Sequence, residues 1–164
     1  LNQAVLAASN APCHKHTHPW KFYILGKATR TKLIPTISRL AAIKSAKQNS
    51  QNLEADCSRA INKITQPPLL IAVTSKKTED DSFREKEDYA ATVCALHNLV
   101  LSLWENGVGS QWSTGSITRD EETYDILSID SKTEEIIGFV KAGYPEKTRE
   151  VRKKPVVDIV NYLD

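Results

Sequence analysis

The sequence predicts an α/β or α+β domain built on one central sheet. Segments with the pattern of strands alternate with segments of helical periodicity along the chain. The 164 residues suffice for one domain of ordinary size with a sizeable core. The sequence has no internal repeat, and no stretch is rich enough in Gly or Ser to divide it. We therefore expect residues 1–164 to form a single domain.

Four segments with strand-like composition predict the sheet. The first is the aromatic and β-branched run WKFYIL at 20–25, and the second is the apolar run PPLLIAVTSK at 67–76. The apolar character of the second run is typical of a buried strand. A short strand is expected within 105–117, after a helix end at Gly107, and the run EIIGFVKAG predicts a longer strand at 135–143.

Apolar residues at helical spacing predict the helices. Their expected ranges are 1–10, 28–47, 53–64, 84–106, 119–127 and a C-terminal segment opened by Pro155. In the longest helix only four polar residues interrupt the stretch from Tyr89 to Trp104, which predicts burial on nearly all sides. This stretch is short for a membrane span and has a His-Asn pair in its middle, so we expect a core helix.

Composition places the protein among globular chains, with 40% hydrophobic and 26% charged residues. The net charge of +2 predicts no strong attraction to nucleic acid or to an anionic membrane. The three cysteines are far apart and form no CxxC pair, which favours free thiols in a reducing compartment such as the cytoplasm. No signal-peptide pattern is present, and the absence of any methionine predicts that the chain begins downstream of its natural start.

A cluster of histidines near the N-terminus is the first candidate site. Cys13, His14, His16 and His18 lie within six residues, and imidazoles suit zinc, copper or nickel. A structural zinc site, however, normally draws its ligands from two separated pieces of chain. Elsewhere the sequence offers one histidine, inside a predicted helix, and two isolated cysteines. We therefore do not expect a native metal site.

Two further segments are candidates with weaker patterns. The run GVGSQWSTGS at 107–116 could present backbone N–H groups and hydroxyls to a ligand, although such loops are most often plain connections. The run REVRKKP at 149–155 could bind a phosphate just before a helix, although charge clusters are usually solvated. Neither segment indicates a function by itself.

Taken in order, these segments resemble the motifs of the nitroreductase family of flavin enzymes. Residues 11–22 (APCHKHTHPWKF) match the frame of the family motif A-P-S-x-x-N-x-Q-P-W-x-F, and the small bacterial minimal nitroreductases have Ala-Pro-Asp-His-Lys at this place. The motif G-x-G-S-x-W-x-T-G corresponds to 107–115, and I-I-G-x-x-x-x-G-Y-P corresponds to 136–145. Basic residues before a final P-x-x-x-I-V segment complete the order.

The resemblance implies a fold, a cofactor and a reaction. The fold would be the α+β nitroreductase sandwich of three layers, with a mixed central sheet flanked by helices, working as a homodimer. FMN would lie at the dimer interface, and NAD(P)H would be the electron donor. The reaction implied is ping-pong hydride transfer to nitroaromatic, quinone or related acceptors. Because the cofactor carries this chemistry, no side-chain nucleophile is expected.

The resemblance also implies which residues contact the cofactor. The family's first motif is a flavin loop, so the histidines would face FMN rather than a metal. His14 matches a histidine that contacts FMN in the minimal enzymes, whereas His16 and His18 replace an asparagine and a glutamine of many members. The FMN contacts implied in this way are Asn10, His14, Lys15, His16, His18, Trp112, Ser113, Thr114, Gly115, Arg152 and Lys154.

Alignment with the minimal enzymes places NAD(P)H near six consecutive residues: Ser102, Leu103, Trp104, Glu105, Asn106 and Gly107. The chain departs from the family at its beginning, where members have a helix with an Arg-Arg-Ser-like motif for the FMN phosphate. Two alternatives therefore stay open. One is a flavin-free family member that acts as a binding or scaffold protein. The other is a metal-binding module built on His14, His16 and His18.

Overall fold

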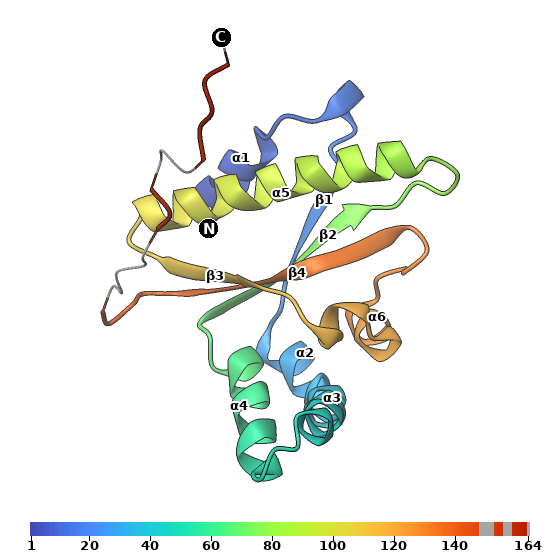
Figure 1. Ribbon diagram of the computed structural model, residues 1–164, viewed down its shortest axis with the longest axis vertical. Helices are drawn as coiled ribbons and strands as arrows, with labels where there is room; N and C mark the ends of the chain where they lie inside the picture. The colour runs from blue at the N-terminus through green and yellow to red at the C-terminus, as the bar shows by residue number, and fades with distance from the viewer. Residues whose placement is uncertain (148–152, 156–158, 164) are drawn as a thin grey trace.

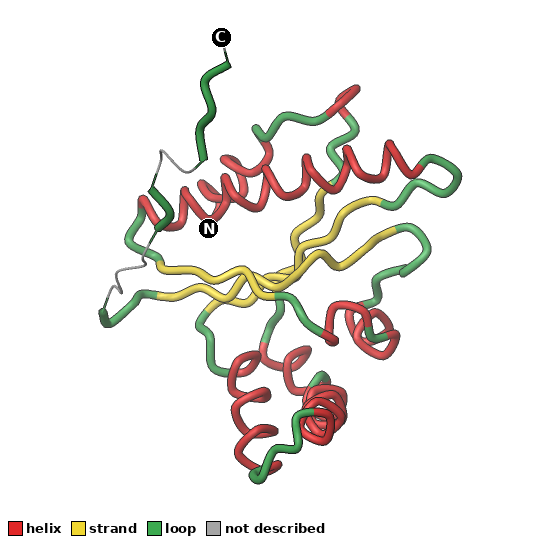
Figure 2. Tube along the Cα trace, in the orientation of Figure 1, coloured by secondary structure: helices red, strands yellow, loops and turns green. Residues whose placement is uncertain are grey.

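A four-stranded sheet separates two groups of helices (Figure 1). The computed structural model describes residues 1–147, 153–155 and 159–163. Figure 2 shows the strands as a middle layer with helices on both faces, which confirms the predicted α+β sandwich of three layers. The helices are α1 (Asn2–Ser9), η1 (His14–His16), α2 (Lys27–Lys32), α3 (Ile34–Lys47), α4 (Leu53–Thr65), α5 (Ser82–Glu105), η2 (Ser116–Arg119) and α6 (Glu121–Leu127), of which η1 and η2 are single 3₁₀ turns.

The sheet has the strand order β1-β2-β4-β3. Its strands are β1 (Trp20–Ile24), β2 (Leu69–Lys76), β3 (Gly109–Ser113) and β4 (Glu134–Gly143). Every pair of neighbouring strands in the described part of the chain is antiparallel, so the expectation of a mixed sheet is wrong there. The physical reason is visible in Figure 1: α2, α3 and α4 return the chain to the end of the sheet where β1 stops, and β2 runs back beside it.

Helices α1 and α5 cover one face of the sheet (Figure 1). The small side chains of Ala4 and Ala8 are buried and allow α1 to approach α5 closely. Between these helices and the sheet lies a core that includes Val73, Leu99 and Val140. This layer places the loop that follows α1 next to the first turns of α5.

The outward face of α5 is exposed, so the expected burial on nearly all sides is wrong for this chain. Ala90, Cys94, His97, Leu101 and Trp104 follow one another at helical spacing, and all are exposed. Leu101 is 51% and Trp104 57% exposed. The sheet and α1 cover only part of the helix circumference, which leaves a largely apolar stripe on the surface.

Helices α2, α3, α4 and α6 form the other layer (Figure 1). The helix predicted over 28–47 is interrupted at Leu33, and α3 begins at Ile34 with Pro35 in its first turn. Proline has no N–H to donate to the carbonyl of Thr31, and its ring would clash with that group in a continuous helix. The segment predicted as one helix therefore forms two, α2 and α3.

A buried arginine of α2 connects the end of β1 to the start of β2. Arg30 is 7% exposed, and its Nε donates to the carbonyl oxygen of Leu25 at 2.7 Å. Its guanidinium also donates to the carbonyl oxygen of Pro67 at 2.5 Å. These charge-assisted bonds join the end of β1 to the start of β2.

A polar cluster ties three strands together at the opposite end of the sheet. The carboxylate of Glu134 accepts hydrogen bonds from Lys21 Nζ at 2.5 Å, Thr74 Oγ1 at 2.6 Å and the Tyr23 hydroxyl at 2.9 Å. Burial by itself would raise the pKa of Glu134. The hydrogen bonds from Lys21, Thr74 and Tyr23 outweigh burial and hold that pKa below its usual value.

The C-terminal segment differs from the prediction of a helix opened by Pro155. Residues 156–158 of that prediction, like 148–152, lie outside the described residues, and Ile159–Leu163 is not helical. Its apolar side chains are exposed, and a helix this short is marginal without a surface on which to pack. Among the described helices, none is long and apolar enough to cross a membrane.

Candidate functional site

The residues from Cys13 to His18, called the histidine loop below, form an exposed turn between α1 and β1. Three of them have left-handed backbones: Lys15 with φ 50°, His16 with φ 53° and His18 with φ 44°. A left-handed conformation costs about 1–2 kcal/mol for a residue other than glycine. Contacts with the rest of the protein must offset this strain.

The imidazoles of the histidine loop are exposed and therefore open to a ligand. His14 Nδ1 lies 3.8 Å from Glu87 Oε1 on α5. The His18 ring meets the Trp20 ring edge to face, with 5.5 Å between their centroids, and its Nδ1 lies 3.8 Å from Cys13 Sγ. Within residues 1–147, 153–155 and 159–163, no three His, Cys, Asp or Glu side chains come together in a way that could hold a metal ion.

A groove of about 540 Å³ lies on the other face of the sheet, between α3, α4 and the loop that follows β3. Ser113, Thr114 and Gly115, three of the sequence-predicted flavin contacts, lie along one side of it. The opposite side is formed by α3 and α4, which contribute apolar residues that include Ile37 and Ile64. The groove combines this apolar side with polar and charged residues, and its size is typical of a cofactor site.

Four cationic side chains line this groove and were not identified from the sequence: Lys44, Arg59, Lys63 and Lys141. Arg59 forms an ion pair with Asp56, whose Oδ2 also accepts from Ser45 Oγ at 2.7 Å. In the part of the chain that the structure describes, no ion pair includes any of the three lysines. The groove therefore carries positive charge that an anionic ligand could neutralise.

Of these four cations, Lys141 gives the strongest indication of an anion site. It is half-buried on β4, and burial together with the nearby charge of Lys63 lowers its pKa from the usual value. Two ammonium groups that repel each other beside an apolar wall favour a bound anion. A lysine inside the otherwise apolar run IIGFVKAG at 136–143 is the sequence signal that could have indicated this site.

Trp112 points away from the groove. It pairs with Val140 in the sheet and so faces the α5 layer, whereas the next residue, Ser113, faces the groove. Its Nε1 donates to the carbonyl oxygen of Ile137 at 3.2 Å, and a Cβ atom on Gly138 would lie 2.1 Å from Nε1. The ring therefore rests directly on the backbone of β4. Only the backbone of Trp112 remains available to a ligand in the groove.

The proposed NAD(P)H segment Ser102–Gly107 lies at the end of α5. Gly107 has φ 73° and terminates the helix: Val108 N donates to Leu103 O, and Gly107 N to Trp104 O, each at 2.9 Å. The Leu103 side chain is buried in the core and cannot contact a ligand. The other side chains of this segment are exposed, apart from a half-buried Ser102.

The remaining sequence-predicted contacts lie apart from one another. Asn10 is exposed and donates through Nδ2 to the carbonyl oxygen of Leu6 at 3.0 Å, within its own helix. Lys154 is exposed, and Arg152 lies outside the described residues. From Glu87, beside the histidine loop, to Ser102 the helix α5 rises by about 22 Å. One chain thus places the histidine loop, the groove and the end of α5 in three separate regions.

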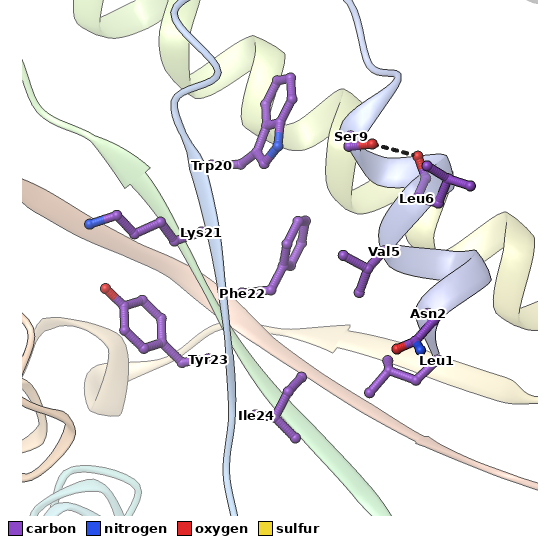
Figure 3. Close-up of a pocket in the computed structure, with 10 residues that line it drawn as sticks. All are labelled: Leu1, Asn2, Val5, Leu6, Ser9, Trp20, Lys21, Phe22, Tyr23 and Ile24. Atoms are coloured by element: carbon purple, nitrogen blue, oxygen red, sulfur yellow. Dashed lines mark hydrogen bonds between the residues drawn. The ribbon is translucent and has the colours of Figure 1, made fainter.

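A second, apolar groove lies beside the edge strand β1. Figure 3 shows Trp20, Phe22 and Ile24 of β1 pointing toward α1, where Val5 and Leu6 complete the groove. Its volume is about 780 Å³. No sequence-predicted flavin or NAD(P)H contact lines it. The apolar lining distinguishes it from the cationic groove beside Thr114.

The fold and the cationic groove define an α+β sandwich protein with a cofactor-sized site at one edge of its sheet. The chain belongs to the nitroreductase family, because the model described as "Nitroreductase family" matches residues 1–144. This confirms the resemblance found in the sequence motifs.

Individual proteins show the same likeness. The chain is 29% identical over 153 residues to a Bacillus subtilis (strain 168) protein named "Putative NAD(P)H nitroreductase YfhC", covering 92% of this chain and 76% of that protein. A nitroreductase-like protein from Bacillus cereus superposes with a TM-score of 0.76 at 22% identity, over 99% of this chain and 82% of that one. A Bacteroides fragilis nitroreductase solved with bound FMN superposes with a TM-score of 0.70 at 19% identity, over 99% of this chain and 86% of that one.

Proposed function

We propose that the protein is an FMN-dependent NAD(P)H oxidoreductase that reduces nitroaromatic, quinone or related acceptors. Its membership of the nitroreductase family supports a flavin-dependent oxidoreductase in general. The observation that carries the proposal is the cationic groove, in which the motif residues Ser113, Thr114 and Gly115 face Lys63 and Lys141. Bound FMN would supply reversible two-electron chemistry, which no side chain provides.

The donor set of the groove fits a phosphorylated aromatic cofactor. Apolar residues of α3 and α4 would contact a flat ring system, and the hydroxyls and backbone of Ser113–Gly115 would bind its polar edge. Lys63 and Lys141 would neutralise negative charge, either on a phosphate or on an electron-rich ring. We propose Arg152 and Lys154 as further phosphate contacts, on the family resemblance alone.

We further propose that the flavin site is completed by a second copy of the chain. The histidine loop lies on the α5 side of the sheet, whereas the groove lies on the other side, so one chain does not join them. The exposed stripe of α5, from Ala90 to Trp104, offers an apolar surface for a homodimer. In such a dimer, His14, His16 and His18 of one chain would face the flavin held in the groove of the other.

NAD(P)H as donor is supported by the name of the Bacillus subtilis relative. We propose a ping-pong order, in which the oxidised nicotinamide leaves before the acceptor binds. Of the predicted donor contacts we keep Ser102 and 104–107, and leave out Leu103, whose side chain is buried. The free thiols of Cys13, Cys57 and Cys94 support a cytoplasmic location for this enzyme.

The test is a steady-state assay of the purified protein with added FMN. NADH or NADPH oxidation should require both FMN and an acceptor such as menadione, and double-reciprocal plots at several acceptor concentrations should be parallel. Parallel plots would support the ping-pong order. If neither nicotinamide is oxidised at any FMN concentration, the enzyme function is wrong and the flavin-free alternative gains support.

A further inference from the structure

Two charged residues of α5, one helical turn apart, contact opposite ends of the histidine loop. We propose that Arg84 and Asp88, with Thr17 of the loop, are positioning residues that fix the orientation of the exposed imidazoles. What those imidazoles face, a flavin, rests on the proposed function. The anchoring itself does not depend on it.

Hydrogen bonds hold the histidine loop against α5 at two points. At the start of the loop, the Arg84 guanidinium donates to the carbonyl oxygen of His14 at 3.1 Å. Near its end, the Thr17 hydroxyl donates to Asp88 Oδ1 at 2.7 Å. That hydroxyl also lies 3.2 Å from the carbonyl oxygen of His14, but its single proton favours the closer, charged acceptor. Between the two points lie Lys15 and His16.

Burial makes Asp88 unusual among the carboxylates of the protein. The residue is 1% exposed, and its Oδ2 has no hydrogen-bond partner, although Arg84 Nε lies 3.5 Å away. A buried ion pair adds little stability compared with apolar side chains of the same volume. A specific contact is therefore the better explanation for this buried pair, and Thr17 of the histidine loop provides that contact.

The conformation of the loop requires such an anchor. Lys15, His16 and His18 have left-handed backbones, which a free loop would leave for more favourable regions. All three imidazoles are exposed, and within the described residues only the His18 ring meets an aromatic side chain of the sheet, Trp20. The remaining contact between the loop and α5, from His14 Nδ1 to Glu87 Oε1, is long at 3.8 Å. The bonds to Arg84 and Asp88 are thus the short links between this loop and the helix.

The first test observes the histidines directly and needs no flavin. The chain has four histidines, and His97, on the exposed face of α5, serves as an internal reference. In NMR spectra of the ring Cε1–H signals, Thr17→Val should shift the three loop resonances and leave the His97 signal unchanged. Thr17→Ser, which keeps the hydroxyl, should restore the original positions. Unchanged loop signals in Thr17→Val would overturn the proposal, whether or not the protein binds FMN.

The second test asks whether the anchor acts through the imidazoles. Loss of a hydrogen bond to a charged group should lower FMN affinity about tenfold in Thr17→Val. In a His14→Ala background, Thr17→Val should reduce FMN affinity by a clearly smaller factor, because the imidazole that Thr17 positions is already absent. Thr17→Ser should behave like the unchanged protein in both backgrounds. Equal losses in both backgrounds would overturn the positioning role, since they would indicate a general effect on folding.

Discussion

Replacing Gly138 by alanine should displace the indole of Trp112 from its place on β4. A Cβ atom at this position would lie 2.1 Å from Trp112 Nε1 and 2.6 Å from Cδ1, far inside contact distance. Moving the ring introduces overpacking, at about 1–3 kcal/mol, and loses the bond from Nε1 to the carbonyl oxygen of Ile137, at about 0.5–1.5 kcal/mol. We expect Gly138→Ala to lower the free energy of unfolding by about 1.5–4.5 kcal/mol.

Urea unfolding, followed by far-UV circular dichroism, measures this loss. The sharper measurement is a double-mutant cycle with Trp112→Ala, which removes the ring before the Cβ atom is added. Any backbone penalty from the φ of 156° at Gly138 stays in both backgrounds, so the cycle isolates the contact with the indole. If Gly138→Ala costs the same with and without Trp112, the steric explanation is refuted.

Three further changes test other parts of the fold. Arg30→Met should lower the free energy of unfolding by about 2–4 kcal/mol, because the buried carbonyl group of Leu25 and the partly buried one of Pro67 lose their donor. The folded-state pKa of Glu134 is depressed, so its charged form stabilises the folded protein above the unfolded pKa of about 4.3, and this stabilisation is lost as pH falls through the folded pKa. Glu134→Gln should therefore flatten the acid side of a curve of unfolding free energy against pH. Leu101→Glu should dissociate the proposed homodimer in sedimentation experiments, whereas Ile43→Glu, at a similarly exposed apolar position on α3, should not.

Local sequence patterns predicted most of the secondary structure because the signals are themselves local. The apolar runs at 20–25, 67–76 and 135–143 became strands, with ends shifted by one or two residues. The helix predicted over 28–47 failed at Pro35, where the missing N–H outweighs the apolar periodicity around it. The direction of strand pairing was not predictable, because it depends on where the intervening helices return the chain.

The candidate site was predictable only where a motif carried it. The motif resemblance identified Ser113–Gly115 as candidate contacts, and they line the groove. Lys63 and Lys141 come from α4 and β4 and meet only in the folded protein. The hydrogen bonds of Arg84 and Asp88 to the histidine loop were equally unpredictable, because about 70 residues separate the partners in sequence. Long-range contacts of single side chains leave no periodic pattern in one sequence.

The exposed stripe of α5 shows a different limit. Its apolar sequence was interpreted as burial in the core, whereas Leu101 and Trp104 lie on the surface of the chain. Periodicity indicates that a face is apolar, but it does not distinguish contact with the same chain from contact with a second copy. Only the structure shows that α1 and the sheet leave this face uncovered.

Titration of FMN into the protein and its groove variants is the most direct test of the central claim, that the cationic groove holds a flavin. We predict that Lys141→Gln lowers FMN affinity about tenfold or more, since it removes a charged partner from a half-buried position. Lys47→Gln, a matched change at an exposed position on α3 that does not line the groove, should leave the affinity unchanged. Equal FMN affinities for the unchanged protein and Lys141→Gln would contradict the assignment of the groove.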